Sequence, residues 1–219
     1  MTASTASPIP LVTLAVALAG AALPAAGAAQ DSVEADGATS AIFGVKVRVG
    51  GRFDNVRMCV ASDPGVKGGP AADVSLFADI GVDDGMSVEF DLPVMRPILF
   101  AAAFRMLQFE PSVTLKFRSA RSGSVAFVGG PTLGLSLHYG PDYESGQRDD
   151  DRGPSFFALG PTIGGYLGLD FARPEGSFDF QLGLTPYVTP LFGVNDPDDH
   201  RGVVIGGLLD GAFRFDPGL

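Results

Sequence analysis

The segment 107–118, LQFEPSVTLKFR, constrains the fold more than any other part of the sequence. Apolar and polar residues alternate along it without exception, so all six apolar side chains fall on one face of an extended chain. A period of two is that of a β-strand and not of a helix. Twelve residues are also enough for a tilted strand to cross a bilayer. The question is whether such strands recur in the number and order that close a barrel.

Seven further segments carry alternating or glycine-rich alternating patterns. The eight expected strands are 41–49, 72–82, 86–94, 107–118, 125–139, 157–171, 178–194 and 203–215. Long or acidic connections follow the first, third, fifth and seventh strands, and short ones follow the second, fourth and sixth. This asymmetry is typical of an up-and-down barrel with tight turns at one end and longer loops at the other. The pattern predicts an antiparallel eight-stranded barrel.

The connections differ in kind. Asp83-Asp84-Gly85 predicts a tight turn, and Gly50-Gly51 allows a bulge or a bend after the first strand. The segment 95–106, MRPILFAAAFRM, is apolar without a clean period. It is expected to be a short helix or an apolar excursion over a rim.

The N-terminus reads as an export signal. The apolar segment 11–22 is broken by Pro24, and the small residues Ala26-Gly27-Ala28 predict cleavage after Ala28 or Ala29. A plain apolar helix is the alternative reading, since residues 1–10 hold no Lys or Arg. The expected organisation is a signal peptide at 1–29, a flexible leader at 30–40 and a single β-barrel domain at 41–219.

Composition excludes several classes of protein. The net charge of −10 argues against binding of nucleic acid. Cys59 is the only cysteine, so neither an intramolecular disulfide nor a multi-cysteine metal site is possible, and no cofactor is expected. Beyond the N-terminus no run of about 20 apolar residues predicts a membrane-spanning helix.

The chain resembles the small eight-stranded outer-membrane β-barrel proteins of Gram-negative-type bacteria. The resemblance covers about residues 41–215 and rests on glycine-rich strands such as LGPTIGGYLGLDF (159–171) and on a last strand ending Ala-Phe-Arg-Phe at 212–215. It implies an all-β, antiparallel up-and-down transmembrane β-barrel in the outer membrane, with a structural or surface-interaction role and no enzymatic activity. The implied partners are outer-membrane lipid and the barrel assembly machinery, and the implied state is a monomer.

The polar faces of the expected strands carry charges of both signs. An eight-stranded barrel has room inside only for side chains or one small ligand, so these charges must pair or recruit water. The expected outcome is a lumen plugged by salt bridges, and the alternative is a narrow polar path. The expected lumen charges are Lys46, Arg48, Asp79, Glu89, Asp91, Glu110, Lys116, Arg118, Asp170, Asp179, Asp210 and Arg214.

Two weaker patterns bear on chemistry. Ser136 and His138 share one face of a strand near the barrel mouth, an arrangement that a lipid hydrolase uses with a carboxylate, but no third group can be assigned from sequence. Binding or hydrolysis of a small lipid-like ligand is therefore an alternative, and catalysis is not expected. The acidic stretches 149–151 and 196–199 offer oxygen ligands for calcium, yet their spacing matches no calcium loop, and solvated loops are expected.

Prolines interrupt the pattern. Five of them lie inside the expected strands, where proline cannot donate to a ladder. They are expected at bulges or at strand ends near the rims; otherwise the chain is a soluble periplasmic β-barrel or sandwich whose apolar faces pack inward. These residues are Pro111, Pro131, Pro161, Pro186 and Pro190.

Overall fold

A computed structural model describes six ranges of the 219-residue chain: 41–54, 68–104, 107–141, 155–171, 178–194 and 202–215. The expected signal peptide and leader, Cys59 and the acidic stretches 149–151 and 196–199 lie outside these ranges. None of the helices within them is long and apolar enough to cross a membrane.

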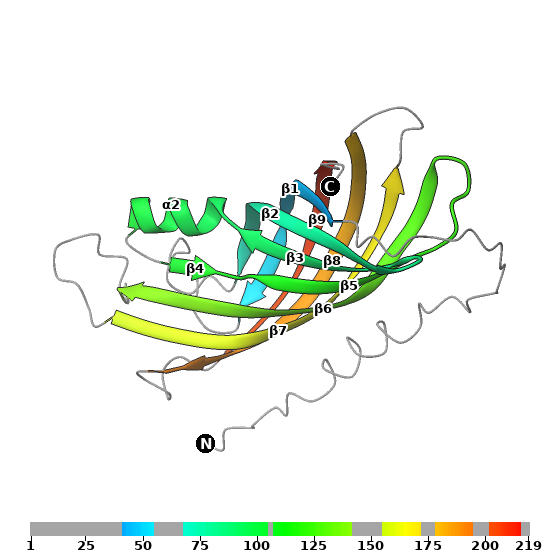
Figure 1. The fold of residues 1–219 in the computed structure, drawn as a ribbon. Helices are drawn as coiled ribbons and strands as arrows, with labels where there is room; N and C mark the ends of the chain where they lie inside the picture. Colours follow the sequence, from blue (N-terminus) through cyan, green and yellow to red (C-terminus); the bar gives the residue numbers. More distant parts are fainter. Residues whose placement is uncertain are drawn as a thin grey trace, which may run out of the picture. The chain divides into compact units, whose positions relative to one another are not determined.

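The described residues form nine β-strands and one α-helix (Figure 1). The elements are β1 Ala41–Asp54, β2 Gly69–Asp83, β3 Met86–Pro93, α2 Met95–Phe104, β4 Leu107–Phe109, β5 Ser112–Arg118, β6 Val125–Pro141, β7 Ser155–Phe171, β8 Phe178–Gly193 and β9 Gly202–Phe215. Each expected strand is present, several are longer than expected, and only the strand at 107–118 is divided in two.

The strands close into a barrel. When β4 and β5 are counted as one strand, each strand pairs antiparallel with the strands before and after it in the chain, and β9 returns to pair with β1. β4 and β5 are two halves of one strand, because both pair with β6 in a single register, Phe109 opposite Leu137 and Ser112 opposite Gly134. The predicted antiparallel, up-and-down eight-stranded β-barrel is thus confirmed.

The two ends of the barrel differ. At the turn end, glycines with positive φ close two hairpins, Gly85 (φ 78°) between β2 and β3 and Gly123 (φ 63°) between β5 and β6. Glycine adopts this left-handed conformation without the cost that a Cβ brings. At the other end, called the helix end here, residues 95–104 of the segment 95–106 form α2, the first of the two expected alternatives.

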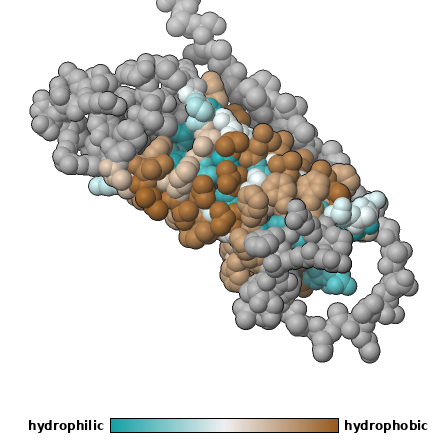
Figure 2. Space-filling view, turned by 90° about the horizontal axis from the view of Figure 1, so that it is seen from above, coloured by the Kyte–Doolittle hydropathy of each residue, from teal (hydrophilic) through white to brown (hydrophobic). Residues whose placement is uncertain are grey.

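The alternation of the strands separates two environments. Inward side chains are largely polar or small, and outward ones are apolar and exposed, as at Phe127 (70%), Leu133 (63%) and Leu209 (56%). Away from the hairpin turn at Asp83, no Asp, Glu, Lys or Arg among the described side chains lies on the outward face of a strand. Apolar side chains accordingly gather over the described surface in Figure 2.

The prolines lie at gaps in the hydrogen-bond ladders between strands and not at the expected bulges. The strand pairing keeps a constant register on both sides of Pro131, Pro161, Pro186 and Pro190, all of which lie in strand interiors. Each residue of an antiparallel strand points its N–H toward one neighbour, so a proline removes a bond from one seam only. The missing pairs fall in the β5–β6 and β7–β8 seams, opposite these prolines.

Pro111 explains the division of the strand at 107–118. It lies between β4 and β5, and its carbonyl accepts a bond from Leu135 N at 3.0 Å. Proline has no N–H with which to return that bond, so the ladder is interrupted there while the register is kept.

Candidate functional site

The interior of the barrel is lined by charged side chains that meet in three clusters. Strand alternation turns every second residue inward, and closure brings side chains from strands far apart in sequence within bonding distance. The clusters lie in the middle of the lumen, near the turn end and near the helix end. They are described in that order.

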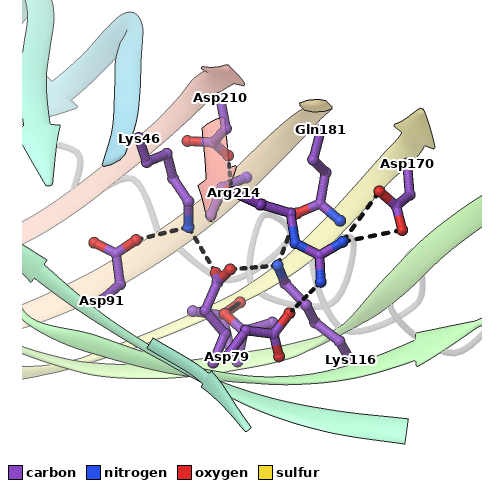
Figure 3. Close-up of polar contacts among 12 residues, drawn as sticks. Lys46, Asp79, Asp91, Lys116, Asp170, Gln181, Asp210 and Arg214 are labelled. Atoms are coloured by element: carbon purple, nitrogen blue, oxygen red, sulfur yellow. Dashed lines mark hydrogen bonds and ion pairs between the residues drawn. The ribbon is translucent and has the colours of Figure 1, made fainter. Parts of the chain in front are cut away.

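The middle cluster is built around Lys46, which is labelled in Figure 3, and Glu89. Both side chains are at most 2% exposed. Lys46 Nζ lies 2.6 Å from Glu89 Oε1 and 2.6 Å from Asp91 Oδ2. The second oxygen of Glu89 accepts a bond from Lys116, so one carboxylate joins β1, β3 and β5. A carboxylate shared by two ammonium groups satisfies more of its lone pairs than a single ion pair does.

Arg48 extends this cluster to β9. Its Nη2 lies 2.6 Å from Asp91 Oδ2, and its Nε lies 3.2 Å from Asp210 Oδ1. Arg48 and Asp210 are directly opposite each other in the β1–β9 register. The middle cluster therefore holds three basic and three acidic side chains and is formally neutral: Lys46, Arg48, Lys116, Glu89, Asp91 and Asp210.

Neutral groups complete the surroundings of Lys116. Its Nζ donates to Gln181 Oε1 at 2.8 Å and lies 4.9 Å from the centroid of the Tyr166 ring. A cation above an aromatic face is attracted by the ring quadrupole. The Tyr166 ring in turn lies over Gly183, where an added Cβ would collide with it. Glycine at this position lets the ring pack flat against the wall.

The cluster near the turn end is centred on Asp170, which is fully buried. Arg214 Nη1 lies 3.1 Å from both of its oxygens, and Arg118 Nε lies 2.9 Å from Oδ2. Arg121 reaches the same carboxylate at 3.5 Å, and Arg214 also lies 3.4 Å from Asp79. Asp170 and Arg214 are labelled in Figure 3.

The cluster at the helix end depends on α2. Arg96, in the first turn of this helix, lies 2.5 Å from Glu110 Oε2 and 3.5 Å from Asp73 Oδ2. The Arg96 backbone N–H also donates to Asp73 Oδ1 at 3.0 Å, so Asp73 caps the helix N-terminus from β2. Arg52 lies 3.8 Å from Glu110. This cluster ties β1, β2, α2 and the β4–β5 junction together.

Ser136 and His138 belong to the same cluster. Ser136 Oγ lies 2.9 Å from His138 Nε2 and donates to Glu110 Oε1 at 3.1 Å. Glu110 is thus the carboxylate that sequence reasoning could not assign. It lies 3.5 Å from Nε2, on the same side of the imidazole as the serine. A hydrolytic triad needs the carboxylate to orient the other ring nitrogen, and Ser136 is only 1% exposed, so the arrangement does not fit an accessible nucleophile.

Eleven of the twelve charged residues named from the sequence take part in these clusters. Asp179, which is half-buried, forms no ion pair within the described part of the chain. Sequence reasoning missed four charged members: Arg52, Asp73, Arg96 and Arg121. Asp73 already fell on the inward side of its expected strand. For Arg52 the signal was the same alternation continued past Gly50-Gly51.

Metal ligands do not gather in the described ranges. No group of three or more His, Cys, Asp or Glu side chains there is placed to hold a metal ion.

Comparison with known proteins shows a likeness to solved structures. No family model and no curated protein matches the chain. Among solved structures, the crystal structure of Neisserial surface protein A (NspA) matches with a TM-score of 0.49 and 11% sequence identity. The match covers 80% of this chain and 96% of that one. At this identity nothing that the neighbour binds or does is transferred to this chain.

Proposed function

We propose that this chain is an outer-membrane β-barrel with a structural or surface-interaction role and a lumen closed by its own salt bridges. One observation carries the proposal: the outward face of the barrel is apolar and, away from one hairpin turn, bears no charge among its described side chains. Soluble monomers rarely expose contiguous apolar patches above a few hundred Å². The soluble alternative needs the apolar faces to pack inward, which is the reverse of the arrangement found.

The height of the apolar surface supports the proposal. On β1 the exposed outward residues run from Phe43 to Phe53, ten residues apart. Ten residues of strand rise roughly 33 Å, and a tilt of about 40° projects that rise onto about 25 Å of membrane normal. This is the height of the apolar band of outer-membrane barrels.

Aromatic residues mark both borders of the band. Near the helix end, Tyr139 and Phe157 form an edge-to-face pair with ring centroids 6.3 Å apart. Near the turn end, Phe180 packs against Phe171 at 6.2 Å and against Phe213 at 5.4 Å. Aromatic girdles flank the apolar band of such barrels, and here phenylalanine supplies most of them.

The lumen supports a role that does not require conduction. Its middle cluster is neutral and its side chains are almost fully buried. An ion crossing this region would have to displace a carboxylate or a cation from existing pairs. We therefore infer a plugged monomeric barrel that meets outer-membrane lipid through its wall and other molecules through its ends, and that reaches the membrane through the barrel assembly machinery.

Fractionation and gel migration test the proposal. We expect the full chain in the outer-membrane fraction, with faster migration on a gel before boiling than after it. In planar bilayers the purified barrel is expected to give no steady current. An unshifted band in the soluble periplasmic fraction would refute the membrane location, and a steady single-channel current would refute the closed lumen.

A second candidate function rests on the contact between Ser136, His138 and Glu110. It is a barrel that binds or hydrolyses a small lipid-like ligand at its helix end. Turnover of a lipid ester that is lost in His138→Gln and kept in Asp179→Asn would establish it. Because the carboxylate and the serine share one side of the imidazole, we expect no turnover by the wild-type protein or by either variant.

A further inference from the structure

The wall of the barrel contains a gap in its strands at the helix end. β3 begins to pair with β2 only at Ser75, opposite Pro93, so residues 69–74 of β2 have no β3 partner. On the other side, β4 pairs with β6 alone in the described part of the chain. At the helix end, no described strand therefore lies between the edge of β2 and the edge of β4.

α2 takes the place of that missing strand. The helix packs against both β2 and β4, and in Figure 1 it runs alongside β4. The chain enters it through a bond from Val94 N to Val74 O at 2.9 Å. A helix satisfies its own backbone hydrogen bonds, so it can complete a wall without ladder partners.

The two faces of α2 match the two sides of the wall. Arg96 and Pro97 are buried, and Arg96 reaches the inward carboxylates of Asp73 and Glu110. On the opposite face Ile98 is 65% and Leu99 53% exposed. Residues 101 and 102, both alanines, are exposed beside them.

The exposed face of the helix continues the apolar band of the barrel. The strands that it packs against are β2 and β4, and their outward faces are apolar there, with Val74 on β2 and Leu107 and Phe109 on β4. No described side chain of α2 after Arg96 is charged, and neither is any outward side chain of residues 69–74 or 107–109. Because the helix face is apolar and continues the band, we expect the helix face and the band to be in contact with the same surroundings.

The helix end is the outer end of the proposed barrel, because the longer connections between strands lie there. We propose that α2 is a membrane-facing wall element whose Ile98–Leu99 face contacts the hydrocarbon chains of the outer leaflet, close to the headgroup boundary. An amphipathic helix at this depth buries its apolar side about 5–10 Å below the headgroups. Within the described residues, the edges of β2 and β4 beside the helix lack a strand partner, which fits this shallow depth, where water still reaches the backbone. The proposal rests on the membrane location proposed above.

Because the chain has no tryptophan, a single introduced tryptophan reports its own surroundings. Three full-length variants are reconstituted in phosphatidylcholine vesicles: Leu99→Trp on the helix, Leu133→Trp on the band and Ala120→Trp in the exposed connection at the turn end. The acyl chains carry bromine either near the headgroup or near the chain end. Heat-modifiable migration on a gel first verifies that each variant is folded.

We expect Leu99→Trp to show blue-shifted emission and to lose more intensity with shallow bromine than with deep bromine. Leu133→Trp is expected to be quenched by brominated lipid as well, and Ala120→Trp only by aqueous iodide. If Leu133→Trp is quenched by lipid while Leu99→Trp responds only to iodide, the helix faces water and the inference is wrong. If neither is quenched by lipid, the membrane location itself has failed.

Discussion

Glu89→Gln is the substitution that tests the lumen clusters most directly. In the wild-type protein the Glu89 carboxylate holds Lys46 Nζ at 2.6 Å and also accepts a bond from Lys116. The neutral amide changes the middle cluster from three cations and three anions to a net charge of +1. Lys46 keeps Asp91 at 2.6 Å, but Lys116 is left with the Gln181 carbonyl and an aromatic ring.

The expected cost follows from leaving one buried ammonium without an anion. Removing one partner of a buried ion pair destabilises proteins by about 3–5 kcal/mol, and Lys116 is only 1% exposed. We expect the free energy of unfolding to fall by about that amount. Glu89→Gln combined with Lys116→Met makes the cluster neutral again and is expected to regain most of the loss.

Urea unfolding of the barrel in phospholipid vesicles, followed by far-ultraviolet circular dichroism, measures these differences. Asp179→Asn is the matched control, because this half-buried carboxylate forms no ion pair in the described part of the chain, and we expect it to cost under about 1 kcal/mol. A loss for Glu89→Gln no larger than that of the control, or a double variant no more stable than the single one, would refute the reasoning.

Three further predictions concern the lumen and the wall. Joint replacement of Arg48 and Asp210 by Met and Leu should lower the unfolding temperature on heat-modifiable gels without creating conductance in planar bilayers; a measured current would overturn the plug. Pro190→Val restores an N–H opposite Pro161 of β7. The new hydrogen bond to the Pro161 carbonyl should raise the free energy of unfolding by about 0.5–1.5 kcal/mol; no gain in urea unfolding would mean that this carbonyl already has a hydrogen-bond donor. Gly183→Ala places a methyl group against the Tyr166 ring and should cost about 1–3 kcal/mol, whereas an unchanged urea midpoint would show that the ring is free to move.

Alternation along each segment was sufficient to predict the strands and the sides of the wall. It placed Lys46, Glu89 and Lys116 inside because each occupies a polar position between apolar neighbours. Their partners did not follow from the same pattern. An ion pair such as Lys116 with Glu89 depends on which strands become neighbours and in what register, and closure of the barrel fixes both.

The features that sequence reasoning missed depend on tertiary contacts. Gly50-Gly51 allowed a bend, but β9 pairs continuously through both glycines and so carries the inward alternation on to Arg52. Arg96 lay in a segment with no strand period, and its role requires a helix beside two strand edges. The prolines suggested bulges because proline breaks a ladder; their missing donors fall in single seams, so the register survives.

The charged lumen also explains why the chain takes one register. In the membrane setting proposed above, a one-residue slip of β1 would turn its inward residues toward lipid, because side chains alternate; Lys46, Arg48 and Arg52 are among them. A lysine or arginine on the lipid face costs about 2–4 kcal/mol at the bilayer midplane, so three of them would cost up to about 6–12 kcal/mol. That penalty is comparable to the whole stability of an ordinary domain. The buried charges therefore select one register, because they raise the free energy of registers shifted by one residue. This holds even where each ion pair adds little net stability of its own.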